Sequence, residues 1–499
     1  PDPVSNAEQL SFLFFFYLVE GIDAENRARA RFLKKPYTSL FDGTWELKNP
    51  LNAPAGAGTI PRERFRWSIW AKGLAGEALV RFVRDEVFAF FAELGQGSAH
   101  NFMAGARLTI DEPTVLTQVV SLVDGLRLDQ ADADTKGDLF EHVLKQIKQA
   151  GELGQFRTPR HIIRAIVRMI DPRLGETVYD PAAGSAGFLV AAYDHIRLAN
   201  SSASGTFETD LDGKRLRRGW GDRLGDRDWD RLRHGTFFGN DVDPKMIRLA
   251  TMNLTLRGLP NVRILLRNVL TTSFDNERKT ELGLPTEGYH VVLANPPFSG
   301  RVDKDRIVDD VKIGTSTATE LLFMKYMMDS LRPGGRCGVI VPEGVLFGST
   351  GAHKELRRQL IENHRVEAVL SLPGGVFQPY SGVKTSILLF QKAGEPVTAG
   401  SDPRTREVWF YEVSDEAFSL DQKRKALYGE DNDLWDGLQK AKAWQSYLHG
   451  EEQDGQPLSD VRAKSVSTDY FQPDYWEERW RSVDEDFLKI FPDKEDAKN

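Results

Sequence analysis

The chain has 499 residues, of which 28% are charged and 40% hydrophobic, a composition typical of a globular protein of about three domains. Its net charge of −8 is unfavourable for binding DNA without a partner, because contacts with phosphates dominate the affinity for DNA. If the protein binds DNA, this charge favours a local basic groove or a partner protein. The single cysteine, Cys337, excludes an intrachain disulfide and a thiolate-rich zinc site. None of the histidines pairs with a cysteine at metal-ligand spacing, so we expect no metal. The apolar stretch 10–19 is too short to cross a bilayer and follows no basic segment, so we expect a cytoplasmic protein with no membrane partner.

The first 150 residues predict a helical domain. Their apolar residues recur at helical spacing, for instance at Ala75, Leu79, Phe82, Val83, Val87, Phe90 and Phe91. The pattern in this region predicts helices but no catalytic or binding residue.

The segment after residue 175 is typical of a nucleotide-binding turn. Residues 176–180 predict a short strand, which leads into the small-residue loop 181–188 and a helix over 189–198. Gly184 and Gly187 permit a tight turn, but their spacing departs from the G-x-G-x-x-G dinucleotide fingerprint. Asp180 ends the strand, and an acid there suits a ligand that carries positive charge rather than a phosphate. S-adenosylmethionine, with an ammonium and a sulfonium, has this character.

A second acid, Asp241, ends the next predicted strand, 236–241, ahead of a helix over 244–256. Its carboxylate could accept both hydroxyls of a ribose; the alternative is a simple helix cap. Between the two acids lies a polar stretch, 200–234, with the basic segment 214–220. We interpret it as a solvated surface insertion, with a DNA-backbone contact as the alternative.

The apolar run 289–294 predicts a buried strand, and Asn295, Pro296, Pro297 and Phe298 follow it directly. Ligands of an open parallel sheet bind at the carboxyl ends of its strands, and two prolines fix the backbone there. The Asn295 amide oxygen and the Pro296 carbonyl could therefore accept the two N–H bonds of an aromatic amine and make its nitrogen nucleophilic, as in adenine. Phe298 would offer a stacking face. A plain strand-to-loop turn is the alternative, since Asn-Pro is common turn chemistry.

Strands and helices alternate from about 150 to 397, which predicts a doubly wound, Rossmann-like α/β domain over 151–397. Within it we expect a helix over 320–331, stopped by Pro333 and two glycines, and a strand over 337–342. Residues 398–499 predict a helical or irregular, charged tail. Its aromatic residues are either anchors for a partner or internal packing: Trp435, Trp444, Tyr470, Tyr475, Trp476 and Trp480.

Taken in order, these motifs resemble one family. The segments are 154–160 (Gly-Gln-Phe-Arg-Thr-Pro-Arg), 180–187 (Asp-Pro-Ala-Ala-Gly-Ser-Ala-Gly), Asp241, 295–298 and 372–385. The chain is similar to the modification subunit of a type I restriction-modification system, an S-adenosylmethionine-dependent DNA adenine-N6 methyltransferase. The resemblance covers residues 150 to 395 strongly and the flanks weakly.

The resemblance implies a set of cofactor-binding residues. Gln155 and Thr158 would help to bind the methionine end of S-adenosylmethionine, and Asp241 would hold the ribose. Asn268 stands where the family usually has an aspartate for the cofactor adenine, and it can still accept through Oδ1. The loop residues that would line the cofactor are Asp180, Ala182, Gly184 and Gly187.

The resemblance also implies base flipping, because the N6 amine of a stacked, paired adenine cannot reach the cofactor methyl group. Phe377 matches the aromatic that would face Phe298 across the flipped base; the alternative is a core aromatic. The implied partners are double-stranded DNA, a separate DNA specificity subunit, a second copy of this chain and an ATP-dependent restriction subunit, since no G-x-x-x-x-G-K-[ST] motif occurs here. Two other functions stay open: methylation of another planar amine or amide, such as protein glutamine or RNA guanine, and a non-catalytic DNA-binding scaffold.

Overall fold

The structure is a computed structural model that describes residues 3–32, 34, 36–53, 58–94, 103, 105–125, 137–140, 158–211, 214–259, 262–378, 381–394, 403–421, 424–425, 427, 432–449 and 463–467. The chain divides into two compact units. The first comprises Pro1–Gly154, Gly184–Ala186 and Asp243–Leu266, and the second Gln155–Ala183, Gly187–Val242 and Arg267–Asn499. The described residues after 397 belong to the second unit.

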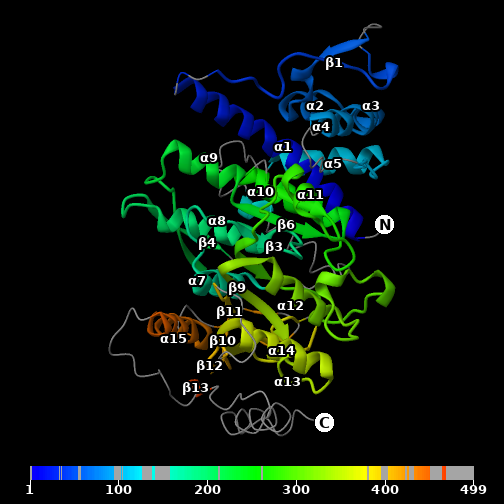
Figure 1. The fold of residues 1–499 in the computed structure, drawn as a ribbon. Helices are drawn as coiled ribbons and strands as arrows, with labels where there is room; N and C mark the ends of the chain where they lie inside the picture. Colours follow the sequence, from blue (N-terminus) through cyan, green and yellow to red (C-terminus); the bar gives the residue numbers. More distant parts are fainter. Residues whose placement is uncertain are drawn as a thin grey trace. The chain divides into compact units, whose positions relative to one another are not determined.

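The first unit is mainly helical, and its helices can be followed in Figure 1. They are α1 (Pro3–Phe32), α2 (Trp67–Gly73), α3 (Gly76–Phe82), a π-helix over Val83–Val87, α4 (Phe88–Leu94), α5 (Pro113–Gly125) and α10 (Pro244–Leu256), with 3₁₀ turns at Pro50–Asn52 and Arg62–Phe65 and short strands β1 (Thr44–Glu46), β2 (Thr59–Pro61) and β7 (Arg263–Leu266). The middle of α1, residues 11–19, is buried throughout, as expected for a helix that is apolar on all sides. Phe16 stacks on Phe91 of α4 and meets Phe88 edge to face.

The second unit contains a large mixed sheet whose strands in this unit run in the order β13-β12-β10-β11-β9-β8-β3-β6. Their bounds are β3 (Val178–Asp180), β6 (Phe237–Asp241), β8 (Tyr289–Ala294), β9 (Leu331–Pro342), β10 (His364–Ser371), β11 (Thr385–Lys392), β12 (Glu407–Glu412) and β13 (Ala463–Ser467). Strands β6, β3, β8 and β9 are parallel neighbours, whereas β11 is antiparallel to β9 and β10. The doubly wound α/β fold predicted from the sequence is present.

Helices cover both faces of this sheet (Figure 1). Helices α7 (Arg160–Ile170), α8 (Gly187–Ala199) and α15 (Asp433–Leu448) pack together on one face, and α12 (Thr319–Ser330) and α14 (Gly351–Asn363) pack together on the other. The unit also has the short helices α9 (Asp226–His234), α11 (Asn276–Glu281) and α13 (Glu343–Phe347), and 3₁₀ turns at Lys304–Arg306 and Asp309–Val311. Helix α7 lies close to β9, because Gly338 has no side chain: a Cβ there would fall 2.6 Å from Ile166 Cγ2.

The expected start of one strand in this sheet was wrong. Strand β9 begins at Leu331, directly after α12, rather than at Cys337. Gly335 lets the strand pass close to β8, since a Cβ there would lie 2.7 Å from the Tyr289 carbonyl oxygen. After residue 397, β12 pairs with β10 and β13 pairs with β12, so these two strands extend the same sheet.

The C-terminal aromatics differ in their surroundings. Trp444 is buried and its Nε1 donates to the Glu367 carbonyl oxygen at 3.0 Å, so it packs internally. The Arg168 guanidinium lies 4.6 Å from the centre of the Trp435 ring. The remaining four, Tyr470, Tyr475, Trp476 and Trp480, lie outside the described residues.

The polar insertion forms a two-stranded hairpin, β4 (Thr206–Leu211) and β5 (Lys214–Gly219), followed by α9. Arg218 is buried, with Nη2 3.9 Å from Asp194 Oδ2 of α8, while Arg217 is exposed opposite Glu208. Because side chains alternate between the faces of a strand, these two neighbouring arginines lie on opposite faces of β5. This placement favours the surface-insertion interpretation.

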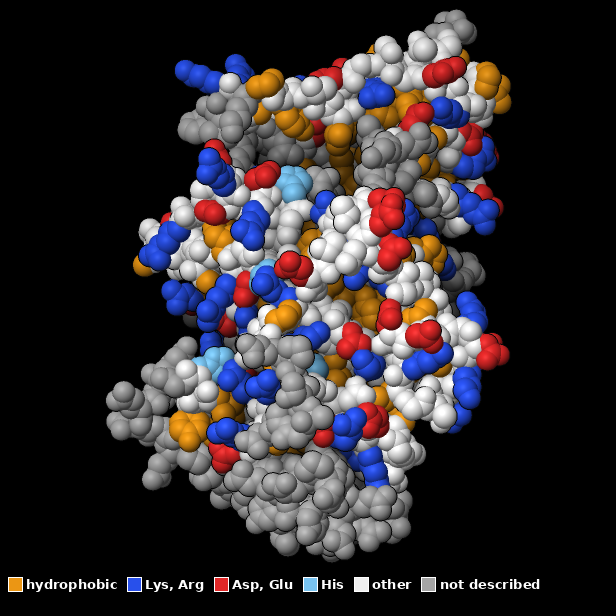
Figure 2. Space-filling model, viewed as in Figure 1, with side chains coloured by type: hydrophobic (Ala, Val, Ile, Leu, Met, Phe, Trp, Pro, Cys, Tyr) orange, Lys and Arg blue, Asp and Glu red, His pale blue; other side chains and the backbone are white. Residues whose placement is uncertain are grey.

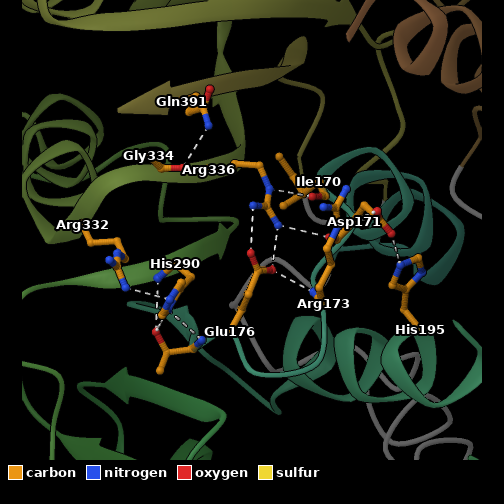
Figure 3. Close-up of polar contacts among 11 residues, drawn as sticks. Ile170, Asp171, Arg173, Glu176, His195, His290, Arg332, Gly334, Arg336 and Gln391 are labelled. Atoms are coloured by element: carbon orange, nitrogen blue, oxygen red, sulfur yellow. Dashed lines mark hydrogen bonds and ion pairs between the residues drawn. The ribbon is translucent and has the colours of Figure 1, made fainter. Parts of the chain in front are cut away.

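The amino edge of the sheet is held together by a hydrogen-bonded arginine (Figure 3). The Arg336 guanidinium of β9 donates to the carbonyl oxygens of Ile170 and Asp171, at the end of α7, at 3.0 and 3.1 Å. It also donates to both oxygens of Glu176, at 3.0 and 2.7 Å. This edge therefore satisfies its charged groups internally.

Candidate active site at the carboxyl edge of the sheet

Three polar side chains predicted as site residues follow adjacent parallel strands. Asp180 ends β3, Asp241 ends β6, and Asn295 comes directly after β8. Strand β3 lies between the other two, with Tyr179 opposite both Phe238 and Val292. All three side chains therefore lie at the carboxyl edge of the sheet, where α/β folds bind ligands.

The side-chain amide of Asn295 is hydrogen-bonded through its nitrogen but not through its oxygen. Its Nδ2 donates to Thr158 Oγ1 at 2.8 Å. Its Oδ1 is buried and has no hydrogen-bond partner among the residues that the structure describes. A buried acceptor without a donor costs about 1–3 kcal/mol, so this atom is matched to a donor that a ligand would bring.

The loop after Asn295 is held by hydrogen bonds from one residue, Thr319. Pro296 is buried and Pro297 is exposed. Thr319, at the start of α12, donates through Oγ1 to the Pro297 carbonyl oxygen at 3.4 Å and through its backbone N–H to the Gly300 carbonyl oxygen at 3.1 Å. A simple turn would account for these bonds, but it gives no reason for burying an unpaired oxygen at Asn295.

The two aromatics expected to enclose a base contact each other directly. The Phe298 and Phe377 rings are both buried, with centroids 5.6 Å apart and planes at 81°. A base cannot stack between two rings that are nearly perpendicular and in contact. In this conformation Phe377 therefore packs as a core aromatic in an edge-to-face contact with Phe298. One of the two rings must move before a base can enter.

Asp180 is buried beside few compensating groups. It accepts a hydrogen bond from the Ala182 backbone N–H at 3.0 Å. Burial raises the pKa of the Asp180 carboxyl to about 8, and the negative charge of Asp241 adds to the rise. A cationic ligand at this position would offset both effects.

The remaining predicted cofactor residues are placed as follows. Gly184 has φ of 52°, which glycine adopts without strain, and a Cβ on Gly187 would come within 3.0 Å of Ile163 Cδ1 of α7. The Ala183 N–H donates to the Asn240 carbonyl oxygen at 2.8 Å, which draws the loop containing Ala182 toward the end of β6. Gln155 lies outside the described residues.

Asp241 is not the cap of the helix that follows it. The N-cap of α10 is Asp243, whose side chain accepts from the Lys245 N–H. The Asp241 carbonyl oxygen accepts from the Arg267 N–H at 2.9 Å. Asn268, next in the chain, uses Oδ1 to accept from the Leu270 N–H at 3.0 Å, so the atom expected to face a cofactor adenine already supports its own turn.

A hydroxyl network under the two acids was missed from the sequence. Tyr179 donates to Asn240 Oδ1 at 2.6 Å, and its hydroxyl lies 2.8 Å from that of Tyr326 on α12. Tyr179 and Asn240 immediately precede Asp180 and Asp241. The sequence did contain a signal for this network, because each of these polar residues stands one position before an acid at the end of a strand. Such residues hold the ends of the two strands in place.

In the part of the chain that the structure describes, no three His, Cys, Asp or Glu side chains cluster as metal ligands. Within the same part, no helix is long and apolar enough to cross a membrane. Figure 2 shows Lys and Arg interspersed with Asp and Glu over the visible face.

Comparison with known proteins identifies the family. The profile of the family described as N-6 DNA Methylase matches residues 131–456, which include strands β3 to β12. The chain belongs to the N-6 DNA methylase family. The type I restriction enzyme EcoEI methylase subunit of Escherichia coli is 29% identical over 412 residues, which cover 79% of this chain and 74% of that protein. The EcoKI methylase subunit of Escherichia coli K12 is 30% identical over 368 residues, 70% of this chain and 62% of that protein.

Solved structures agree in fold with this N-6 DNA methylase. A modification subunit from Vibrio vulnificus YJ016 has a TM-score of 0.66 at 22% identity, covering 93% of this chain and 87% of its own. The type I methyltransferase subunit from Streptococcus thermophilus has a TM-score of 0.58 at 16% identity, with 96% of each chain covered. The family resemblance predicted from the motif order is thus confirmed.

Proposed function

We propose that this N-6 DNA methylase transfers the methyl group of S-adenosylmethionine to N6 of adenine in a specific DNA sequence, as the modification subunit of a type I restriction-modification complex. The observation that carries the proposal is the buried, unpaired Oδ1 of Asn295 at the carboxyl end of β8. It is a hydrogen-bond acceptor held at the edge where ligands bind, and the target amine is a donor.

The adenine amine is a poor nucleophile because its lone pair is delocalised into the ring. Asn295 Oδ1 and the Pro296 carbonyl oxygen accept its two N–H bonds, which favours a tetrahedral nitrogen and stabilises the positive charge that develops on it. The acceptors do not need to reorganise, since Thr158 holds the amide and Thr319 holds the loop after it. Removing such a preorganised group typically lowers kcat by about 10²- to 10³-fold.

The residues at the edge fit S-adenosylmethionine. When bound, that cofactor supplies an electrophilic methyl group on a sulfonium. The buried carboxyl of Asp180, with its raised pKa of about 8, suits the cofactor's ammonium, and Asp241 accepts the ribose hydroxyls. The backbone of residues 182–184 and Gly187 allows close approach, and Gln155 and Asn268 complete the proposed set.

The target base reaches Asn295 by flipping out of the duplex, at a cost of a few kcal/mol. Stacking on Phe298 returns about 1–3 kcal/mol of this. Phe377 swings away from its edge-to-face contact with Phe298 and stacks on the second face of the base. The contact between the two rings is thus the closed form of the base site.

The proposed partners follow from the names of the relatives. These are methylase subunits of type I restriction enzymes, and one structural neighbour with a TM-score of 0.62 comes from work on assembly of the type I restriction-modification system. We propose that a separate specificity subunit reads the DNA sequence, that two copies of this chain join it, and that a restriction subunit, where present, supplies the ATP-driven activity. The 398–499 segment contributes to the specificity-subunit contact.

The test is to co-express the chain with its specificity subunit, incubate the complex with labelled S-adenosylmethionine and DNA, and locate the label. We expect N6-methyladenine from the wild type and a loss of at least about 100-fold with Asn295→Ala. Asn276→Ala, an exposed asparagine at the start of α11, is the matched control and keeps full activity. Label on protein or RNA, or full activity in Asn295→Ala, would overturn the proposal.

A further inference from the structure

We infer that Thr158 is a positioning residue for the reaction, which holds the amide of Asn295 in the position from which Oδ1 meets the target amine. This inference rests on the proposed function of Asn295. It assigns Thr158 a role beyond the cofactor contact expected from the sequence.

The geometry that supports it joins two segments far apart in the chain. Thr158 precedes α7 and Asn295 follows β8, and within the second unit their side chains meet at 2.8 Å, with Nδ2 as donor and Oγ1 as acceptor. Thr158 is only 6% exposed. Water therefore does not compete for the bond, and the bond holds the side chain in one rotamer.

The direction of the bond matters because the two ends of an amide have opposite hydrogen-bonding character. With Nδ2 bonded to Thr158, Oδ1 lies on the opposite side of the amide, where it is buried and no described residue donates to it. A rotation of the amide by 180° would present N–H groups there instead. Two donors cannot hydrogen-bond the N–H groups of an adenine amine, so the rotated amide would be inactive.

The loops on either side restrict other solutions. Pro159 is the N-cap residue of α7, and Pro296 follows Asn295, so the backbone next to each partner is constrained by a proline. Only the side-chain torsions of these two residues can then still vary, and the hydrogen bond between the side chains restricts them. The threonine hydroxyl thus holds a group that itself contacts the substrate.

The test uses two substitutions at position 158. Thr158→Val keeps the shape and removes the hydroxyl; Thr158→Ser keeps the hydroxyl. With the complex saturated in S-adenosylmethionine and DNA, we expect kcat to fall by about 10-fold or more in Thr158→Val and to return to within about threefold of wild type in Thr158→Ser. The matched control is Thr236→Val, a buried threonine at the amino edge whose Oγ1 donates to the Arg231 carbonyl oxygen at 3.1 Å; its kcat stays at the wild-type value.

A double-mutant comparison separates positioning from an independent role. In the Asn295→Ala background, Thr158→Val should change the residual rate by less than about twofold, because the group that it positions is gone. An equal loss in both backgrounds would overturn the inference and leave the proposed function intact. Full activity in Asn295→Ala would instead show that the proposed function is wrong.

A second readout does not depend on turnover. In cofactor-free protein labelled with ¹⁵N-asparagine, the side-chain amide signal of Asn295 is assigned by its absence in Asn295→Ala. We expect this signal to shift and its hydrogens to exchange faster in Thr158→Val, and to be retained in Thr158→Ser and Thr236→Val. An unchanged signal in Thr158→Val would overturn the inference.

Discussion

Replacing Asp180 by asparagine is expected to change how the stability of the protein depends on pH. The Asp180 carboxyl is buried and its pKa is raised from 3.8 to about 8 in the folded state. The folded state therefore binds a proton that the unfolded chain has lost between pH 4 and pH 8. It follows that the free energy of unfolding falls as the pH rises through this window.

The magnitude follows from the size of the shift. A change from 3.8 to about 8 corresponds to roughly 5 to 6 kcal/mol over the whole window, and about 4 kcal/mol of it falls between pH 5 and pH 8. Asparagine has no proton to lose, and its Oδ1 keeps the hydrogen bond from the Ala182 N–H. Asp180→Asn should therefore match the wild type near pH 5 and be more stable by several kcal/mol at pH 8.

The assay is chemical denaturation of both proteins at half-unit steps from pH 5 to pH 8.5. Comparing the two curves cancels the other titrating groups, such as His364, whose pKa burial lowers to about 4. Parallel curves would refute the reasoning.

A complementary measurement is calorimetry of S-adenosylhomocysteine binding at pH 7. If the ammonium of this ligand pairs with Asp180, binding releases close to one proton from the wild type and none from Asp180→Asn.

Three other substitutions give distinct results. Gly338→Ala places a methyl group against α7 and should destabilise by about 1–3 kcal/mol, measured by denaturation. Glu176→Gln breaks the ion pair with Arg336 at the amino edge, where both side chains are less than a fifth exposed; we expect about 2 kcal/mol less stability and unchanged kcat. Phe377→Ala uncovers the face of a flipped base that lies opposite Phe298, so 2-aminopurine at the target position should fluoresce more strongly than in the wild-type complex.

The local parts of the fold were predicted closely from the sequence. Strand β8 and helix α10 have the predicted bounds, 289–294 and 244–256. Both have clear signals: β8 is an apolar run that ends at Asn-Pro, and α10 starts with a proline after an aspartate cap. The order of the motifs was sufficient to predict the family.

Long-range pairings were not predictable in the same way. Strand β12 pairs with β10 although the whole of β11 lies between them in the chain. The local pattern of residues 407–412 does not indicate which strand it pairs with. The bond between Thr158 and Asn295 joins residues 137 positions apart, and the edge-to-face contact of Phe298 and Phe377 depends on side-chain rotamers. Each is decided by tertiary packing, which a single sequence does not encode in any short window.

The two edges of the sheet differ in how far their buried polar groups are paired. At the amino edge, Arg336 has a partner for each of its bonding groups in Glu176 and the end of α7 (Figure 3). At the carboxyl edge, within the described part of the chain, Asn295 Oδ1 is buried without a donor and Asp180 is buried without a paired cation. Under the proposed function, an amine donor and a cationic cofactor would remove both deficits. Because a fold retains such groups against their cost mainly at functional sites, their coincidence on neighbouring strands is what separates a methyl-transfer site from an ordinary strand-to-loop edge.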